Sequence, residues 1–375
     1  MTAKRLVLIG GGHAHMVTLA NLSAFVRKGY EVTVIQPSEY HYYSGMGPGM
    51  LGGTYRPGDI RFATRRVVEK QGGRFVLGKA AFIDSRQQLV RLDDSDRTLP
   101  YDVLSCNAGS FVPTDIVTTV DHPDIFTVKP IESLLRARAR ILELSRDQAI
   151  DIAVVGGGPS SIEISGNIRQ LCRNAGGTPP RIRVYAGDRL LARAPEKVGR
   201  LARRSLTERG IDIVEKAYVD RIEPGRIVLQ NGETRNADII FTAVGVRPSA
   251  LFADSGLPTG PDGGLRVNRF LQCVSQANIF GGGDCIHFDP APLDKVGVYA
   301  VRENPVLFAN LMAALEGGNL HPFDPGGRYL LIYNLGDGNG IFCKWSIIFG
   351  GALAFRLKDY IDRRFMARFQ SLERE

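Results

Sequence analysis

The chain has 375 residues, which is enough for two or three domains with hydrophobic cores of their own. Its apolar content of 44% and charged content of 23% are typical of a soluble globular enzyme. The formal net charge of +8 comes from scattered arginines without interleaved aromatic residues, which argues against nucleic-acid binding. No apolar run approaches the roughly 20 residues needed to span a bilayer.

Five cysteines are present, and none belongs to a CxxC or CxxxxC pair. The first predicted strand begins almost at the N-terminus, which leaves no room for an export signal. An odd number of cysteines without such a signal predicts a reducing compartment and therefore a cytoplasmic location.

The chain opens with a strand–turn–helix pattern that is typical of dinucleotide binding. A buried strand at 6–9 is followed by the turn Gly10-Gly-Gly-His-Ala-His15, a helix over 13–27 and a strand at Glu31–Gln36. Gly10 makes the tight turn, and Gly12 lets backbone N–H groups approach a pyrophosphate. His15 stands where a third glycine normally permits close packing, so we expect a wider helix–strand crossing.

Gln36 ends the second strand, where an acidic residue usually binds the ribose hydroxyls. Its amide either bonds a ribose or is an ordinary polar residue at a strand end. The HxH pair of His13 and His15 has no further ligand nearby in sequence, so we predict no metal site. The following loop, 40–53, is too rich in glycine for a regular element.

Strands at 78–84 and 88–92 are expected to form a small inserted sheet, and an apolar strand over 101–107 runs into Ala108 and Gly109. A second glycine-rich turn follows a helix over 131–144. The strand before this turn begins at Ile150. The turn itself contains Gly156, Gly158 and Ser160, and Ser161 stands at the third glycine position. This pair of turns indicates two dinucleotide sites in one chain.

The second unit continues with a strand at Arg181–Tyr185, a helix over 197–209 and strands at 211–216, Arg226–Leu229 and 239–244. Tyr185 occupies the strand-end position and could stack on a nucleotide or donate a hydrogen bond to it, which leaves the choice between NADH and NADPH open. Glu163 lies early in a helix, where it either stabilises the helix end or faces the domain interface.

A third turn, Gly281-Gly-Gly-Asp-Cys285, follows a strand and precedes a helix over 295–315. The Asp284 carboxylate can bond the ribityl chain of a flavin, and Cys285 is interpreted as a small buried thiol. If the first unit resumes near Leu251, the second domain is inserted within it. We therefore predict an α/β fold of two Rossmann-like domains, the second inserted in the first, with a small C-terminal α+β segment. The predicted boundaries are 1–118 with 251–325, then 119–250, then 326–375.

The C-terminal segment has short strands followed by an aromatic and basic helix. Leu357, Ile361, Phe365 and Phe369 recur every four residues beside several arginines. This apolar stripe fits a helix lying on an anionic membrane, but many soluble helices share the pattern, and a capping helix or a homodimer contact is the ordinary alternative.

Together these motifs resemble the flavoprotein superfamily of pyridine nucleotide-disulphide oxidoreductases and type II NADH dehydrogenases. Within it, four stretches are similar to the oxidoreductase-like domain that is sometimes fused to selenide, water dikinase: 10–15, 43–49, 295–302 and 356–366. The resemblance implies FAD in the first domain, NAD(P)H in the second, and hydride transfer to the flavin and on to an acceptor. It implies FAD contacts at Asp284, at the helix start Gly297, Val298 and Tyr299, and at the backbone of Ala80.

The full set of predicted cofactor-binding residues is Gly10, Gly12, His13, Ala14, Gln36, Ala80, Ala108, Gly109, Gly156, Gly158, Ser160, Tyr185, Gly245, Gly283, Asp284, Gly297, Val298 and Tyr299. Glu163 and Lys129 are the candidates for tuning the cofactor or protonating the acceptor, although Lys129 also fits a solvent-facing position before a helix.

Two departures from the family pattern bear on the acceptor. The CxxxxC of disulphide reductases is absent, and the helix 299–304 lacks the glutamines of the quinone motif. Three hypotheses remain: a soluble NAD(P)H-dependent flavin oxidoreductase, a quinone reductase attached to the inner face of the membrane, and a nucleotide-binding protein without enzymatic activity.

Overall fold

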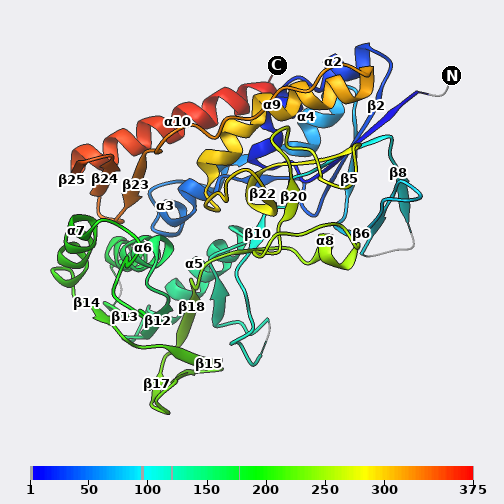
Figure 1. The fold of residues 1–375 in the computed structure, drawn as a ribbon. Helices are drawn as coiled ribbons and strands as arrows, with labels where there is room; N and C mark the ends of the chain where they lie inside the picture. The colour runs from blue at the N-terminus through cyan, green and yellow to red at the C-terminus, as the bar shows by residue number, and fades with distance from the viewer. Residues whose placement is uncertain (1–2, 94–96, 120, 177, 375) are drawn as a thin grey trace.

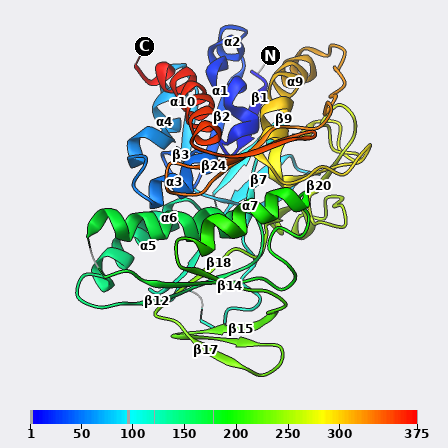
Figure 2. The same ribbon diagram turned by 90° about the vertical axis from the view of Figure 1, so that its left-hand side faces the viewer.

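The computed structural model describes residues 3–93, 97–119, 121–176 and 178–374. Figure 1 shows the blue and yellow parts of the chain together in one domain and the green part in another. Helix α10 (Ala352–Arg374), red in Figures 1 and 2, lies along the first domain.

The first domain is built on a five-stranded parallel sheet. Its strand order is β21 (Ile279–Gly281), β9 (Val103–Cys106), β1 (Arg5–Ile9), β2 (Glu31–Gln36) and β5 (Arg74–Leu77). Residues 6–9 of the central strand β1 are all apolar and buried, as expected of a parallel strand covered on both faces. The covering helices are α1 (Met16–Ala20), α2 (Leu22–Arg27), α4 (Thr64–Lys70) and α9 (Gly297–Glu316).

The second domain repeats this architecture. Its strand order is β11 (Ile125–Thr127), β18 (Ile239–Thr242), β12 (Asp151–Val155), β13 (Arg181–Tyr185) and β14 (Ile211–Val214). Its helices are α5 (Glu132–Leu144), α6 (Pro159–Ala175) and α7 (Glu196–Thr207).

The first sheet takes β9 from before the second domain and β21 from after it, which confirms that the second domain is inserted in the first. The chain leaves through β10 (Ser110–Phe111) and returns through β19 (Arg247–Pro248), and these two segments pair antiparallel. The boundary residues proposed from the sequence stay a prediction.

Smaller elements complete both domains. The first domain carries an antiparallel sheet of β6 (Ala80–Asp84), β7 (Leu89–Leu92) and β8 (Thr98–Pro100). It also has two strand pairs, β3 (His41–Tyr42) with β4 (Arg61–Phe62) and β20 (Leu265–Val267) with β22 (Ile286–Phe288). Its two short helices are α3 (Gly47–Leu51) and α8 (Leu251–Asp254). The second carries β15 (Val219–Glu223), β16 (Arg226–Leu229) and β17 (Thr234–Asn236).

The C-terminal segment bridges the two domains. The antiparallel strands β23 (Leu331–Asn334), β24 (Gly340–Lys344) and β25 (Ile347–Gly351) contact α6 and α7, whereas α10 contacts α1, α4 and β4. Met366 and Phe369 of α10 belong to the hydrophobic core that also contains Ile162 and Leu206 of the second domain.

Two local predictions were wrong. The loop 40–53 contains helix α3, in which Pro48 lies in the first turn, where its missing N–H costs nothing. The helix predicted over 13–27 starts as a short 3-10 turn, His13–His15, and is interrupted at Asn21, whose backbone lies outside the helical region.

Candidate functional site

Asn107 lies where the first glycine turn meets the turn after β21. A Cβ at Gly10, whose φ is +84°, would lie 2.2 Å from the carbonyl oxygen of Asn107. A Cβ at Gly12 would lie 2.9 Å from Asn107 Nδ2, and one at Gly283 would lie 2.9 Å from Asn107 Oδ1. Asn107 Nδ2 is buried and has no hydrogen-bond partner among the described residues. The three glycines therefore form a narrow cradle with an unused donor in its wall.

Gln36 supports the cradle from behind. Its Oε1 accepts a hydrogen bond of 2.9 Å from Gly11 N, and its Nε2 donates to Ser38 O (2.6 Å) and Tyr40 O (3.0 Å). The amide thus holds the first turn against the loop after β2, which is the more ordinary of the two roles considered for it.

The two histidines of the HxH pair point in different directions. His15 is fully buried in the core, and its ring bonds Gly10 O (2.5 Å) and Ser105 Oγ (2.8 Å). His13 instead lies among His41, Tyr43 and Phe365, with ring centroids 5.1, 5.1 and 5.9 Å away.

His13 keeps some accessible surface although its ring lies deep in the molecule. Its Nδ1 lies 3.2 Å from His41 Nε2, and its Nε2 has no partner in the described parts of the chain. Burial lowers the pKa of His13 to about 4 and that of His41 to about 3, so both imidazoles are neutral at physiological pH.

Asp284 joins the two domains. Lys129, before α5 of the second domain, donates to Asp284 Oδ2 at 2.8 Å, and Ser110 Oγ donates to the same oxygen at 2.7 Å. Burial opposes ionisation, but the charge and hydrogen bond of Lys129 outweigh it and lower the pKa of Asp284. Lys129 is only 26% exposed, so it is not the freely solvated residue that the sequence left open.

The second glycine turn repeats the cradle. Gly156 has φ +130°, and a Cβ there would lie 2.3 Å from Ala243 O. Gly158 and Gly245 border open space, and no side chain caps the start of the 17-residue helix α6 at Gly158. Ser161 Oγ is buried without a partner within the described residues. Tyr185, by contrast, packs its side chain into the core between β12 and the sheet of β15 and β16.

Glu163 on α6 lies at the junction of all three parts of the fold. Its Oε1 accepts a hydrogen bond of 2.7 Å from Asn334 N of β23. Burial raises the pKa of Glu163 to about 7, although the nearby Lys358 charge opposes this shift. The structure therefore places Glu163 at the interface. The expected helix-end role is wrong, because no acidic residue lies in the first turn of α6 and the helix-dipole effect is confined to that turn.

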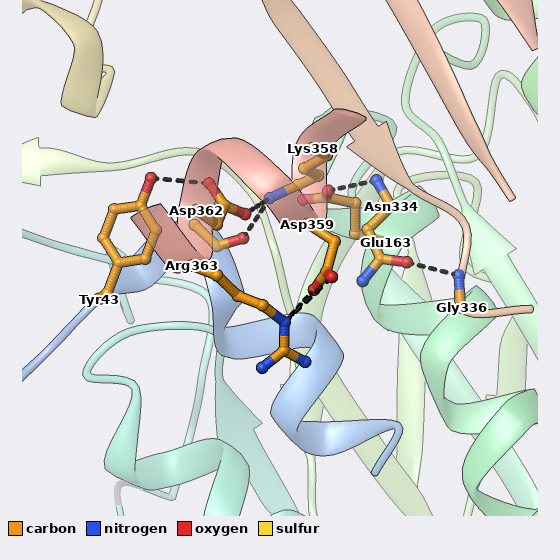
Figure 3. Close-up of polar contacts among 9 residues, drawn as sticks. Tyr43, Glu163, Asn334, Gly336, Lys358, Asp359, Asp362 and Arg363 are labelled. Atoms are coloured by element: carbon orange, nitrogen blue, oxygen red, sulfur yellow. Dashed lines mark hydrogen bonds and ion pairs between the residues drawn. The ribbon is translucent and has the colours of Figure 1, made fainter. Parts of the chain in front are cut away.

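Figure 3 shows the polar cluster beside Glu163. Lys358 of α10 forms a buried ion pair with Asp362 at 2.5 Å and also donates to Gly45 O at 2.7 Å. Tyr43 OH donates to Asp362 Oδ1 at 3.0 Å. Burial is the main cause that raises the pKa of both Tyr43 and Asp362. The cluster connects the loop after β3 with the C-terminal helix.

The predicted residues thus fall into distinct groups. Gly10, Gly12, His13, Asp284 and Gly283 meet around the first turn, and Ala14 packs beneath Gly282 and Gly283. Gly109 and Gly297 border open space. Ala80 is buried at the start of β6, two residues after Gly78, whose N–H bonds Gln36 O (3.0 Å).

The remaining predicted positions lie on or near the helix starts and strand ends. Ala108 follows β9, Val298 and Tyr299 open α9, and Ser160 lies in the first turn of α6. The sequence did not single out His41, Tyr43, Asn107, Ser110, Lys358 or Asp362, which the structure adds. Asn107 ends the strand predicted over 101–107, and Ser110 directly follows Gly109. Tyr43, Lys358 and Asp362 lie within the stretches 43–49 and 356–366 that carry the family resemblance, but no pattern marked their side chains as part of a site.

The arrangement fits two dinucleotides. The unpaired Asn107 Nδ2 donor, the unpaired His13 Nε2 and the glycine cradle suit a pyrophosphate and flavin. Asp284 Oδ1 has no partner among the described residues and is available to a ribityl hydroxyl. The second cradle and the free start of α6 suit the pyrophosphate of NAD(P)H. No group of three or more His, Cys, Asp or Glu residues in the described ranges could hold a metal ion.

The two cradles on parallel sheets define a flavoprotein with two dinucleotide-binding domains. Residues 4–305 match the family model described as pyridine nucleotide-disulphide oxidoreductase, and the chain belongs to that family. It is therefore a FAD-dependent NAD(P)H oxidoreductase. All five cysteines are free, and four are buried, so the described chain holds no disulphide.

The chain is similar to curated and solved relatives over nearly its whole length. It is 25% identical to the type II NADH:quinone oxidoreductase of Staphylococcus aureus (strain NCTC 8325 / PS 47), covering 96% of this chain and 94% of the relative. The sulfide:quinone oxidoreductase of Aquifex aeolicus matches with TM-score 0.80, 18% identity and 99% and 92% coverage. NDH2 of Plasmodium falciparum, in complex with NADH, matches with TM-score 0.78, 15% identity and 98% and 99% coverage.

Proposed function

We propose that this oxidoreductase transfers electrons from NAD(P)H to a quinone at the inner face of a membrane. The observation that carries this proposal is the position of α10, which presents one face to solvent and the other to His13 in the first glycine turn. The relatives named as quinone oxidoreductases support the choice of acceptor.

The outer face of α10 is apolar and unusually exposed. Leu353 is 69% and Tyr360 is 60% exposed, and Leu357 and Ile361 lie on the same face. The turn between β24 and β25 adds Trp345, which is 59% exposed, and Ile347 follows it. We call this apolar surface the α10 outer face. The basic residues near it are Lys344, Arg356, Arg364 and Arg368. Such a surface suits the interface of an anionic bilayer.

The inner face of the same helix closes over the first glycine turn. Phe365 stacks on the His13 ring with an interplanar angle of 8°, and Asp362 accepts the hydrogen bond from Tyr43. A membrane beneath the α10 outer face would therefore be separated from His13 and the first glycine turn by this one helix.

The protein's own residues provide binding and proton control. When bound, FAD supplies the two-electron chemistry that couples reduced nicotinamide to the acceptor. Asp284 and the first cradle would hold it, and the second cradle would hold NAD(P)H. Lys129 keeps the two domains in register through Asp284. Glu163, whose pKa is raised to about 7, can hold or release a proton near neutral pH at the domain junction.

The proposed attachment is peripheral. No helix among the described residues is long and apolar enough to pass through a bilayer.

A soluble acceptor remains the second candidate because helix α9 lacks the glutamines of the quinone motif. Arg302, within the corresponding stretch, instead bonds the carbonyl oxygens of Pro325 and Gly327. A homodimer contact through the C-terminal segment stays a prediction.

The test combines vesicle flotation with two activity assays. The FAD-loaded protein should float with vesicles that contain anionic phospholipid, and it should reduce a short-chain quinone with NAD(P)H. The double variant Trp345→Ser/Leu353→Ser should lose vesicle binding and activity with membrane-embedded quinone, while activity with ferricyanide is unchanged. A matched control, Val274→Ser, removes an apolar side chain that is 41% exposed outside this surface.

The proposal would be excluded if wild-type protein did not bind the vesicles and reduced ferricyanide but no quinone. That result would favour a soluble acceptor. Protein that loads FAD but never oxidises NADH or NADPH would favour the non-enzymatic hypothesis.

A further inference from the structure

Glu303 is a buried carboxyl group that none of the roles above uses. It lies on α9, six residues after the helix start at Gly297, and only 1% of its surface is exposed. Its Oε2 accepts a hydrogen bond of 2.5 Å from Gly283 N. Glu303 therefore lies directly behind the turn that carries Asp284.

The turn that carries Asp284 packs closely against both Ala14 and Glu303. A Cβ on Gly282 would lie 2.9 Å from the Ala14 side chain and 3.1 Å from Glu303 Oε2. A cavity of about 10 Å³ adjoins the carboxyl group and is also lined by Gly283, Asp284, Lys295 and Tyr299. That volume is near the minimum for one water molecule, which could connect the carboxyl group with solvent.

The charges that face Glu303 come from two neighbouring elements. Asp284, on the turn after β21, disfavours a second negative charge, and Lys295, before α9, favours it. Cys285 is also in electrostatic contact with Glu303, but burial holds its thiol neutral. Desolvation is the largest influence and raises the pKa of Glu303 to about 7, so the carboxyl group is poised between its two forms at neutral pH.

Both elements that flank Glu303 are predicted to contact FAD, namely the Asp284 turn and the first turn of α9. Electrons added to the cofactor increase the negative charge beside an already crowded carboxylate. We propose that the Glu303 carboxylate takes up one proton from solvent when the bound flavin is reduced and releases it on reoxidation. The carboxylate gains an O–H bond and becomes a neutral acid, the electrons come from NAD(P)H, and no covalent bond to the cofactor forms.

The proposal predicts a steeper pH dependence of the flavin reduction potential. Each proton bound together with two electrons contributes about 30 mV per pH unit, because a tenfold change in equilibrium constant corresponds to 29.6 mV for a two-electron couple. The additional slope should begin near pH 7 and extend upward, since reduction raises the pKa of Glu303 further. Below that range the group is protonated in both states, and the additional slope should vanish.

The experiment is an equilibrium reductive titration of FAD-loaded protein with dithionite and mediators from pH 5.5 to 9. Above pH 7 the slope of Glu303→Gln should be shallower than that of wild type by up to about 30 mV per pH unit. Glu316→Gln is the matched control, because Glu316 lies at the exposed far end of the same helix. Equal slopes for wild type and Glu303→Gln would overturn the proposal.

A second measurement covers the case in which Glu303→Gln fails to retain FAD. The reduced-minus-oxidised infrared difference spectrum of wild type at pH 8 should gain the C=O band of a protonated carboxyl group, and its absence would also overturn the proposal. Neither measurement uses NAD(P)H, quinone or membranes, so a negative result here is distinct from a failure of the proposed function.

Discussion

The buried ion pair between Lys358 and Asp362 offers a sharp test of how α10 is held in place. The two side chains are 10% and 6% exposed, so their charges interact with little solvent screening. Removing one partner of a buried pair typically costs 3–5 kcal/mol, because the other charge is left desolvated. In Asp362→Ala, Lys358 keeps its bond to Gly45 O and, at pH 8, the nearby Glu163 charge, so we expect a cost at the lower end at that pH, about 3 kcal/mol.

Lys358→Met should cost less than Asp362→Ala at low pH. Burial already raises the pKa of Asp362 above its ordinary value, and the loss of Lys358 raises it further. The isolated carboxyl group can therefore become neutral as the pH falls and still bond Tyr43. The double variant Lys358→Met/Asp362→Leu removes both charges and should recover most of the lost stability.

The assay compares the midpoints of thermal unfolding of wild type, the two single variants and the double variant, measured by circular dichroism at pH 5.5 and pH 8. For a chain of this size, about 3 kcal/mol corresponds to roughly 4 °C. A loss below about 1 °C for Asp362→Ala, or a double variant no more stable than that single variant, would show that the pair is too well solvated for this reasoning.

Three further predictions concern the glycine turns and Glu303. Gly10→Ala should abolish FAD retention because its Cβ would overlap Asn107 O, whereas Gly29→Ala, also at φ +84° but with nothing nearby, should retain the cofactor in absorption spectra. Gly156→Ala should retain FAD but lose flavin bleaching by NAD(P)H, unless the second turn has no role in nucleotide binding. Glu303 has a folded-state pKa of about 7, above the ordinary value of 4.5, so its ionisation destabilises the fold progressively from about pH 4.5 and fully above pH 7. Glu303→Gln should therefore raise the apoprotein's melting temperature at pH 8 and not at pH 4.5; an equal effect at both pH values would contradict a raised pKa.

The double Rossmann architecture could be predicted because its signals are local. A buried apolar strand, a glycine turn and a helix follow one another within about 20 residues, and strands β2, β13 and β16 lie where the pattern placed them. Glycine is required at positions 10 and 156 because a Cβ there would overlap a backbone carbonyl oxygen. This requirement can be recognised in the sequence. The structure therefore confirms the fold class.

The site contacts could not be predicted in the same way because they join distant segments. Lys129 reaches Asp284 across 155 positions, and Tyr43 reaches Asp362 across 319 positions. Charged residues on a helix are ordinarily solvated, so periodicity gave no reason to place Lys358 and Asp362 inside. Their burial depends on where α10 lies against both domains.

The apolar stripe on α10 shows that a four-residue repeat does not by itself predict which of its residues are buried. Residues spaced by four advance 400° around a helix of 3.6 residues per turn, so each step drifts by 40°. From Leu357 to Phe369 the drift is about 120°, enough to move from one face to another. Leu357 and Ile361 are accordingly 36% and 40% exposed, whereas Phe369 is 5% exposed in the core. One repeat therefore supplies both a surface face and a buried face.

This division within one helix determines how membrane attachment can be separated from the packing of α10 against the two domains. Deleting α10 would remove the outer face together with Phe365, Asp362 and the core residue Met366, so vesicle binding and the environment of His13 would change at once. Substitutions at Leu353 and Tyr360 change only side chains that are more than half exposed. Only such outer-face variants can distinguish an enzyme that needs the membrane for its acceptor from one that needs α10 for its fold.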